Sequence, residues 1–198
     1  MLEYGRARRD EEAELLDFAN MVFSLAREPV DFLLAQPKVY SVPGFADISM
    51  VAREDGRIKG LVNAIHGTLI LGEERLRYGY VGTVSAHPYE RGRGIMKTLM
   101  NMVMERLEQE GCHFLALGGQ RQRYGYFGFE DAGAAITLRF TEASIHHAPE
   151  AGPGGALRIM SMDEAGEDAL GKARALHGVQ ALRCDRGKWD FLKLLRTE

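Results

Sequence analysis

The spacing of hydrophobic residues is helical at the start of the chain. Between Glu11 and Ala26 apolar side chains recur every three or four positions, which predicts an amphipathic helix with Asp10 as its N-cap. A second, short helix is predicted over Val30–Ala35, with Pro37 ending it. Both helices precede any strand signal.

The hydrophobic period then changes to two. Apolar residues alternate with polar ones from Ile48, and Asp55-Gly56 is a strong signal for a two-residue hairpin turn. The returning strand is predicted over Ile58–Ile70, and a third strand over Leu76–Ala86 after a turn at Glu73-Glu74. Strands joined by such short turns form an antiparallel meander.

A longer helix follows the meander. Ile95, Leu99, Val103 and Leu107 share one stripe, which predicts a helix lying on a sheet and ending before Gly111. The apolar run Phe114–Leu117 predicts a buried strand. Alternation returns at the end of this part, at Ile136, Leu138 and Phe140. Residues 1 to about 140 therefore indicate one α/β domain.

A cluster of proline and glycine marks the strongest boundary. Residues 148–155 (A-P-E-A-G-P-G-G) predict a linker between a domain at 1–147 and a C-terminal extension at 156–198. In the extension we expect a strand over Leu157–Met160 and a helix over Asp163–Leu176. The tail carries Trp189 and several leucines, so it must dock on the first domain or on another subunit, and we expect a homodimer.

Composition narrows the class of protein. Of the 198 residues 45% are hydrophobic and 27% charged, as in average soluble proteins, and a net charge of −3 gives no reason to expect nucleic-acid binding. No apolar run predicts a membrane span, and no signal or transit peptide is evident. The two cysteines, Cys112 and Cys184, supply neither a disulfide scaffold nor a metal site. We therefore expect a cytoplasmic protein without a metal.

The turn before the long helix is the most informative segment. A strand runs into His87-Pro88, and Arg91-Gly92-Arg93-Gly94 then opens directly into the helix. Free amides at a helix start, flexible glycines and two arginines suit a phosphate or pyrophosphate, although a simple turn is the structural alternative. The sequence does not match the P-loop, because Met96 occupies the position of its last glycine. It does not match the dinucleotide fingerprint either, because Lys97 occupies the position of the third glycine.

This segment resembles the acyl-CoA signature of the GNAT N-acetyltransferase superfamily, R/Q-x-x-G-x-G/A. Arg91 and Gly94 match it, after the strand end Val84-Ser85-Ala86. Met96 departs from the final small residue, as in a subset that resembles the enhanced-intracellular-survival acetyltransferases. The resemblance implies a GNAT-like α/β (α+β) fold, with a mixed, mostly antiparallel central sheet flanked by helices.

The resemblance also implies a cosubstrate, acetyl-CoA. Backbone groups of the strand end would bind the pantetheine arm, and amides of the following loop and helix start would bind the pyrophosphate. Gly119 and Gln120 fall where related enzymes line the pantetheine–adenylate path. The implied cofactor-binding residues are Val84, Ser85, Ala86, Arg91, Gly92, Arg93, Gly94, Ile95, Met96, Lys97, Gly119 and Gln120.

A second glycine cluster carries the implied catalytic residue. Tyr124-Gly125-Tyr126-Phe127-Gly128-Phe129 is similar to the family element Y-x-x-(apolar)-G-(aromatic). In that family the tyrosine protonates the departing thiolate, and a phenol with a pKa of about 10 can do so at neutral pH. Tyr124 is therefore the expected general acid. A packing role is its alternative, and Tyr126 competes only if the helix register differs.

The general base is not identified by the sequence. His87 and His66 are candidates, and both are more often structural at such positions. Cys112 has no evident partner base, so a cysteine nucleophile is not expected. His146-His147 more simply form part of a loop than of a metal site.

Two functions fit these signals. The first is an acyl-CoA-dependent N-acetyltransferase, in which a primary amine of a small molecule or peptide attacks acetyl-CoA directly. The alternative is a catalytically silent acyl-CoA-binding or regulatory module with the same fold. Aminoglycosides, polyamines, protein lysines and small amines all stay open as acceptors.

Overall fold

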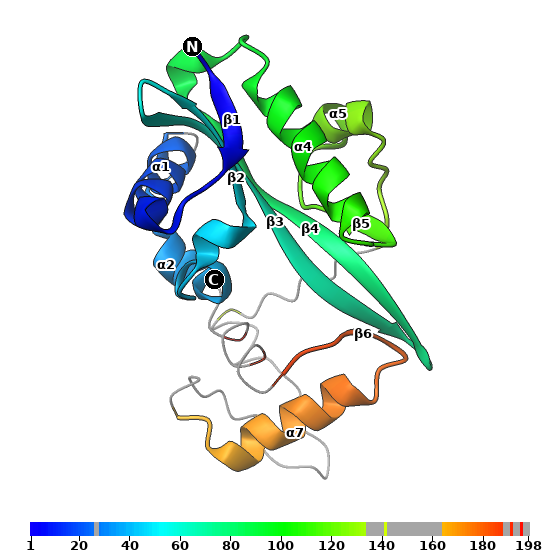
Figure 1. The fold of residues 1–198 in the computed structure, drawn as a ribbon. Coiled ribbons are helices and arrows are strands. Elements are labelled where there is room, and N and C mark those ends of the chain that lie inside the picture. Colours follow the sequence, from blue (N-terminus) through cyan, green and yellow to red (C-terminus); the bar gives the residue numbers. More distant parts are fainter. Residues whose placement is uncertain (26–27, 134–140, 142–163, 188–190, 192–194, 196–198) are drawn as a thin grey trace. The chain divides into compact units, whose positions relative to one another are not determined.

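The computed structural model describes residues 1–25, 28–133, 141, 164–187, 191 and 195 (Figure 1). The chain divides into two units, one made of residues 1–118 and 174–198 and the other of residues 119–173. The predicted linker at 148–155, the strand Leu157–Met160 and the alternating positions near Ile136 lie outside the described residues. The predicted domain boundaries stay predictions.

A six-stranded sheet forms the frame of the first unit. Its strands are β1 (Glu3–Arg6), β2 (Ser49–Glu54), β3 (Arg57–Leu71), β4 (Glu74–Ala86), β5 (Phe114–Ala116) and β6 (Leu182–Cys184). Strands β1 to β5 follow one another in space, and β6 pairs with β3. Among the strands that the structure describes, β4 and β5 are the one parallel pair. The expected mixed, mostly antiparallel sheet is confirmed.

Helices cover this sheet on both faces (Figure 1). The regular helices before β5 are α1 (Glu12–Ser24), α2 (Phe32–Ala35), α3 (Pro37–Tyr40) and α4 (Ile95–Gln109). Short 3₁₀ turns lie at Arg9–Glu11 (η1), Phe45–Ile48 (η2) and Pro88–Glu90 (η3). Helix α1 packs on β3 and β4, and α4 packs on β2, β3 and β4 from the other side. The α/β class follows from this layering.

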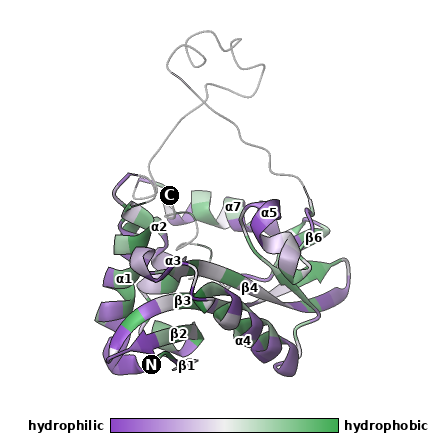
Figure 2. Cartoon of the chain, turned by 90° about the horizontal axis from the view of Figure 1, so that it is seen from above, coloured by the Kyte–Doolittle hydropathy of each residue, from purple (hydrophilic) through white to green (hydrophobic). Residues whose placement is uncertain are grey.

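The predicted stripe of α4 is its buried face. Ile95, Leu99, Val103 and Leu107 are buried, and Figure 2 shows hydrophilic and hydrophobic residues together on this helix. On the α1 side, Leu15, Phe18 and other residues form a second apolar cluster. Each face of the sheet therefore has its own apolar layer, as the amphipathic pattern requires.

The second unit contains α5 (Arg121–Tyr124) and the 3₁₀ turn η4 (Gly125–Phe127). Helix α7 (Glu167–Gly178) begins in this unit and ends in the first. The helix predicted over Asp163–Leu176 is thus present with later bounds.

Two local expectations need correction, at Asp10 and at β5, and two features of the fold were not foreseen. Asp10 lies within η1 and does not cap α1, whose N-cap is Glu11. Helix α2 ends at Ala35, before Pro37, as predicted, and Pro37 is also the first residue of the unforeseen helix α3, a position that proline favours. Strand β5 is half exposed, with Phe114 37% exposed, because it ends the strand order of the sheet. Strand β1 was not predicted, because four residues with mixed polarity carry no clear period.

The C-terminal tail docks on its own chain. β6 pairs with Leu69–Leu71 of β3, on the edge that β2 occupies further along. The main chain extends the contact, since the amide of Asp185 donates to Thr68 O at 2.7 Å. No described helix is long and apolar enough to cross a membrane. The predicted homodimer stays a prediction.

Candidate functional site

Strand β4 has an open edge near its end. It pairs with β5 only at Tyr78, Gly79 and Tyr80, and then continues to Ala86. Beyond Tyr80, no described strand pairs with β4 on that side, whereas β3 pairs with it on the other side as far as Ala86. The sheet is therefore splayed between β4 and β5, and the exposed backbone can pair with an extended ligand.

The backbone direction identifies which residues face this opening. The amide of His87 donates to Lys59 O at 2.9 Å, so it points toward β3. Backbone polar groups alternate in direction along a strand, so those of Ser85 also point toward β3. The amides and carbonyls of Val84 and Ala86 then point to the open edge. The structure thus gives these two predicted residues a direction that suits main-chain binding.

A β-bulge shapes the same edge. Between the pairs Leu61–Ser85 and Asn63–Gly82, two residues of β4 lie opposite one residue of β3. One of them, Thr83, has a φ of 48°, which is unusual for a β-branched side chain. Such strain persists only where neighbouring contacts fix it.

Buried hydrogen bonds hold the bulge in place. Tyr40 donates its hydroxyl to Thr83 Oγ1 at 2.8 Å, and Asn63 Nδ2 donates to the same oxygen at 3.2 Å. Asn63 in turn accepts from Ser49 Oγ at 2.8 Å. Burial raises the pKa of Tyr40 to about 12, so its hydroxyl stays protonated as a donor at neutral pH. The network links α3 and β2 to the strained residue of β4.

The glycine-rich loop opens α4 without a side-chain cap. Gly92 and Gly94 have φ values of 81° and 76°, which glycine adopts freely. Gly94 is the N-cap of α4, and it has no side chain that could cap the first amides of the helix. The amide of Thr98 donates to the carbonyl oxygen of Gly94 at 3.0 Å. The amides of Ile95 and Met96 therefore lie at a helix start, where backbone donors can face an anion.

The two loop arginines differ in their contacts. Arg93 bonds to both carboxylate oxygens of Glu54 at 2.7 and 2.9 Å and pairs also with Glu90. The Arg93 guanidinium lowers the pKa of Glu54 to about 2. Arg91 is exposed and forms no ion pair with the described residues. The side chain of Arg93 thus anchors the loop to β2, and that of Arg91 is available to a ligand.

The candidate histidines lie in different settings. His87 caps η3, where its Nδ1 accepts from the amide of Tyr89 at 3.3 Å. His66 lies on β3, half exposed, with Nε2 2.7 Å from Glu110 Oε2. Burial raises the pKa of the Cys112 thiol, which disfavours the reactive thiolate. His66 is among the residues that line the cavity described next, and its ring is turned toward Glu110.

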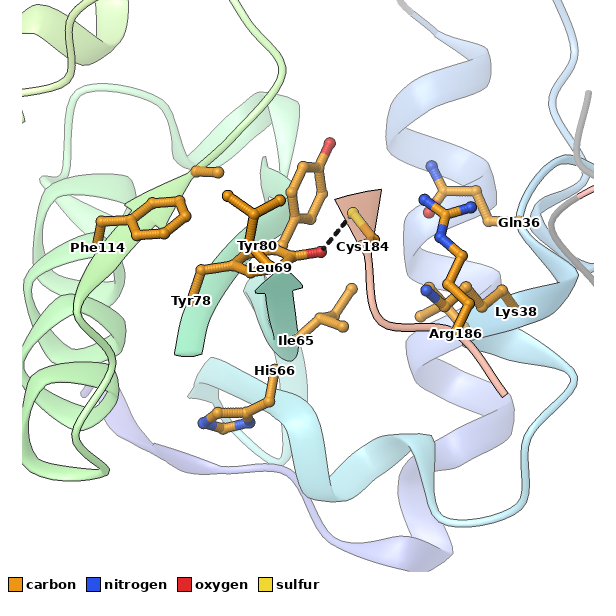
Figure 3. A pocket seen from close by; sticks show the side chains of 12 residues that line it. Gln36, Lys38, Ile65, His66, Leu69, Tyr78, Tyr80, Phe114, Cys184 and Arg186 are labelled. Carbon is orange, nitrogen blue, oxygen red and sulfur yellow. Dashed lines mark hydrogen bonds between the residues drawn. The ribbon is translucent and has the colours of Figure 1, made fainter. Parts of the chain in front are cut away.

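That cavity has a volume of about 520 Å³ and lies in the first unit (Figure 3). Its floor is formed by side chains of β3, β4 and β5, and its rim by Gln36, Lys38 and the segment after β6. Tyr80 and Ala116, the last paired residues of β4 and β5, both line it. The cavity therefore reaches the point at which the sheet splays.

Three predicted residues belong to the second unit. Gly119 and Gln120 are exposed, and Gln120 is the N-cap residue of α5. Tyr124 is the last residue of α5 and is buried. Its ring packs edge-on against that of Phe129, with the ring centroids 6.4 Å apart. Tyr126 is 68% exposed. Tyr124 and Tyr126 therefore have distinct environments, although they are only two residues apart, in α5 and in η4.

Several residues near the site were not found by sequence reasoning. Lys38, Tyr80 and Arg186 line the cavity, and Tyr40 and Asn63 hold the bulge. They come from separate elements, and no motif joins them. The one available signal was the polar Asn63 within an otherwise apolar strand pattern. In the described part of the chain, no three or more His, Cys, Asp and Glu side chains gather as a metal site.

Comparison with known families gives one match over most of the chain. The family described as "Acetyltransferase (GNAT) domain" matches residues 3–132. No curated protein matches.

Solved structures share the fold at low sequence identity. A GNAT family acetyltransferase from Brucella melitensis, in complex with acetyl-CoA, is 22% identical with a TM-score of 0.56, over 66% of this chain and 84% of that one. A predicted acetyltransferase from Clostridium acetobutylicum with acetyl-CoA is 17% identical with a TM-score of 0.58, over 75% and 100%. A GCN5-related N-acetyltransferase from Ralstonia eutropha JMP134 is 18% identical with a TM-score of 0.58, over 70% and 99%.

Proposed function

The chain belongs to the GNAT acetyltransferase family, and on that premise we propose that it transfers the acetyl group of acetyl-CoA to a primary amine. The observation that carries the proposal is the open edge of β4 together with the uncapped start of α4, where the amides of Ile95 and Met96 face no side-chain cap. One ligand with an extended arm and a pyrophosphate suits both features. Acetyl-CoA has these two parts, and two structural neighbours were crystallised with it.

The cosubstrate would be bound mainly by main-chain groups. Val84 and Ala86 would pair with the amides of the pantetheine arm, as an added strand does, while Ser85 holds β4 to β3. The amides from Gly92 to Lys97 would bind the pyrophosphate, and Arg91 would add a charge. Gly119 and Gln120 would border the same path. Arg93 acts in this scheme through its amide, since its side chain holds Glu54.

The reaction would be a direct transfer. The amine nitrogen attacks the thioester carbonyl, a C–N bond forms, and the C–S bond breaks with its electron pair on sulfur. Tyr124 donates its phenolic proton to this thiolate and regains one from water. The proton lost by the amine passes to a base that the sequence does not identify, for which His66 and His87 are the two candidates.

Finer assignments are part of the proposal. We assign the chain to the enhanced-intracellular-survival-like subgroup, because Met96 stands where most of the family has a small residue. We also propose the division into a domain at 1–147, a linker at 148–155 and an extension at 156–198.

The test is turnover with a matched pair of tyrosine variants. CoA release from acetyl-CoA is measured over a panel of primary amines for the wild type, Tyr124→Phe and the control Tyr126→Phe. Loss of a general acid costs about 10²-fold or more in kcat, so we expect that loss in Tyr124→Phe only. The affinity for acetyl-CoA, measured by calorimetry, should be the same in all three proteins.

Two results would contradict the proposal. Full turnover in Tyr124→Phe would remove this residue from the chemistry. Tight binding of acetyl-CoA with no turnover on any amine would favour the silent acyl-CoA-binding module.

A further inference from the structure

The cavity at the splayed end of the sheet contains two cations without acidic partners. Lys38 of α3 and Arg186, which follows β6, both line it, and none of the lining residues that the structure describes is acidic. Neither cation forms an ion pair with the described residues, and the Nε of Arg186 is buried without a hydrogen-bond partner. Burial of a guanidinium nitrogen without an acceptor is costly, which indicates that a ligand supplies one.

Neighbouring carboxylates are engaged with other groups. Asp185, adjacent to Arg186 in sequence, pairs with Arg75. Glu110 contacts His66 and bonds to Arg106 Nε at 2.9 Å. The charge of the cavity is therefore positive on the side formed by Lys38 and Arg186, which Figure 3 shows opposite Phe114.

The opposite wall is apolar and aromatic. Tyr78 stacks on Phe114 with their ring centroids 5.5 Å apart, and Ile65 and Leu69 lie between this pair and the cations (Figure 3). The Tyr78 hydroxyl contacts Cys184 Sγ at 3.6 Å. Burial raises the pKa of Tyr78 to about 12, so the ring stays neutral. A ligand that fills the cavity must offer both an apolar body and an acidic group.

The position of the cavity relates it to acetyl transfer. Tyr80 and Ala116 form its border at the point where β4 and β5 part, and the open edge of β4 begins there. An amine held in the cavity would thus face a thioester held at that edge. The segment after β6 completes the wall, so the C-terminal extension takes part in the site.

We propose that this cavity binds the acetyl acceptor, and that the acceptor is an amine with a compact apolar body and an acidic group held by Lys38 and Arg186. The inference rests on the proposed function and adds the class of substrate to it. The volume of about 520 Å³ suits a small molecule. Polyamines and aminoglycosides are disfavoured, because their charges would meet two cations of the same sign.

The test compares an acid with its amide on one scaffold, and adds a phosphonate and a polyamine. Binding of phenylalanine, phenylalaninamide, 2-aminoethylphosphonate and spermidine is measured by calorimetry on the full chain without acetyl-CoA, and acetylation is then measured for each. We expect the carboxylate to bind about tenfold more tightly than its amide, as one charge-assisted bond allows. The phosphonate arm reports whether a phosphate-like group is preferred, and spermidine should bind most weakly.

Arginine variants assign the preference to this cavity. Arg186→Gln should remove the preference for the acid over the amide. Arg183→Gln should keep it, because Arg183 lies three residues upstream and donates to Gln180 O at 2.8 Å. Lys38→Gln gives the same comparison from a different element, should Arg186→Gln fail to fold.

Three outcomes would overturn the inference. They are equal or tighter binding of the amide or spermidine, a preference that both Arg186→Gln and Lys38→Gln retain, and no binding of either acid. The outcomes for the proposed function are separate. Selective binding of the acid without acetylation would refute acetyl transfer and leave the cavity assignment standing. Acetylation of neutral amines alone would support acetyl transfer and refute the cavity assignment.

Discussion

At the scale of single residues, Thr83 has the least favourable backbone conformation near the open edge. A β-branched residue with a positive φ costs about 1–3 kcal/mol, and the contacts around it must offset this. Its hydroxyl oxygen receives hydrogen bonds from Tyr40 and Asn63, both buried. The shape of the strand that would bind the cosubstrate therefore depends on two side chains from other elements.

This dependence predicts the effect of removing one hydroxyl. Tyr40→Phe leaves Thr83 Oγ1 without its shorter bond, so we expect a loss of about 1–2 kcal/mol in the free energy of unfolding. Because the bulge loosens, the affinity for acetyl-CoA should fall as well. Urea unfolding and calorimetry measure the two effects. Tyr4→Phe is the control, since Tyr4 makes no side-chain hydrogen bond with the described residues. Unchanged stability and affinity in Tyr40→Phe would show that the network does not support the bulge.

At the scale of elements, the conformation of the loop before α4 depends on glycine backbone angles and on an ion pair together. Gly92 and Gly94 adopt positive φ, and Arg93 ties the loop to Glu54 at the end of β2. The uncapped helix start follows at once. An anion at this position would meet free amides in an exposed, anchored loop.

Two substitutions at Gly92 separate the effect of a negative charge in the loop from the effect of an added side chain. Asparagine and aspartate both tolerate positive φ, and a Cβ at this position meets no atom within 4 Å. Gly92→Asn should therefore reduce acetyl-CoA affinity only slightly. Gly92→Asp places a carboxylate beside the predicted pyrophosphate, so we expect a further loss of about tenfold or more at low salt. Titration of both variants at two salt concentrations measures this difference, and equal affinities would place the pyrophosphate elsewhere.

At the scale of the whole molecule, local patterns were predictable and distant contacts were not. The hairpin at Asp55-Gly56, the buried stripe of α4 and the helix end before Gly111 follow from spacing and from turn chemistry, and the structure confirms them. β1 and β6 have four and three residues, too few to establish a period, and pairing with β2 and β3 stabilises them. Their position depends on tertiary contacts that the sequence pattern does not encode.

The candidate site likewise contains residues that could be predicted from the sequence and residues that could not. The loop from Arg91 to Lys97 is continuous in sequence, so its role at a helix start could be inferred from a motif. The bulge at Thr83 and the cations Lys38 and Arg186 are brought to the site by folding, and no spacing rule relates them. Arg93 shows a further limit, because its charge pattern suggested a ligand contact whereas its guanidinium is bound by Glu54 and Glu90.

The central claim is that acetyl-CoA lies along the open edge of β4 with its pyrophosphate at the start of α4. A crystal structure of the complex tests it most directly. The account predicts pantetheine amides within hydrogen-bond distance of Val84 and Ala86, and pyrophosphate oxygens about 3 Å from the amides of Gly92 to Lys97. A cofactor bound elsewhere, with the β4 edge and these amides left in solvent, would contradict the account.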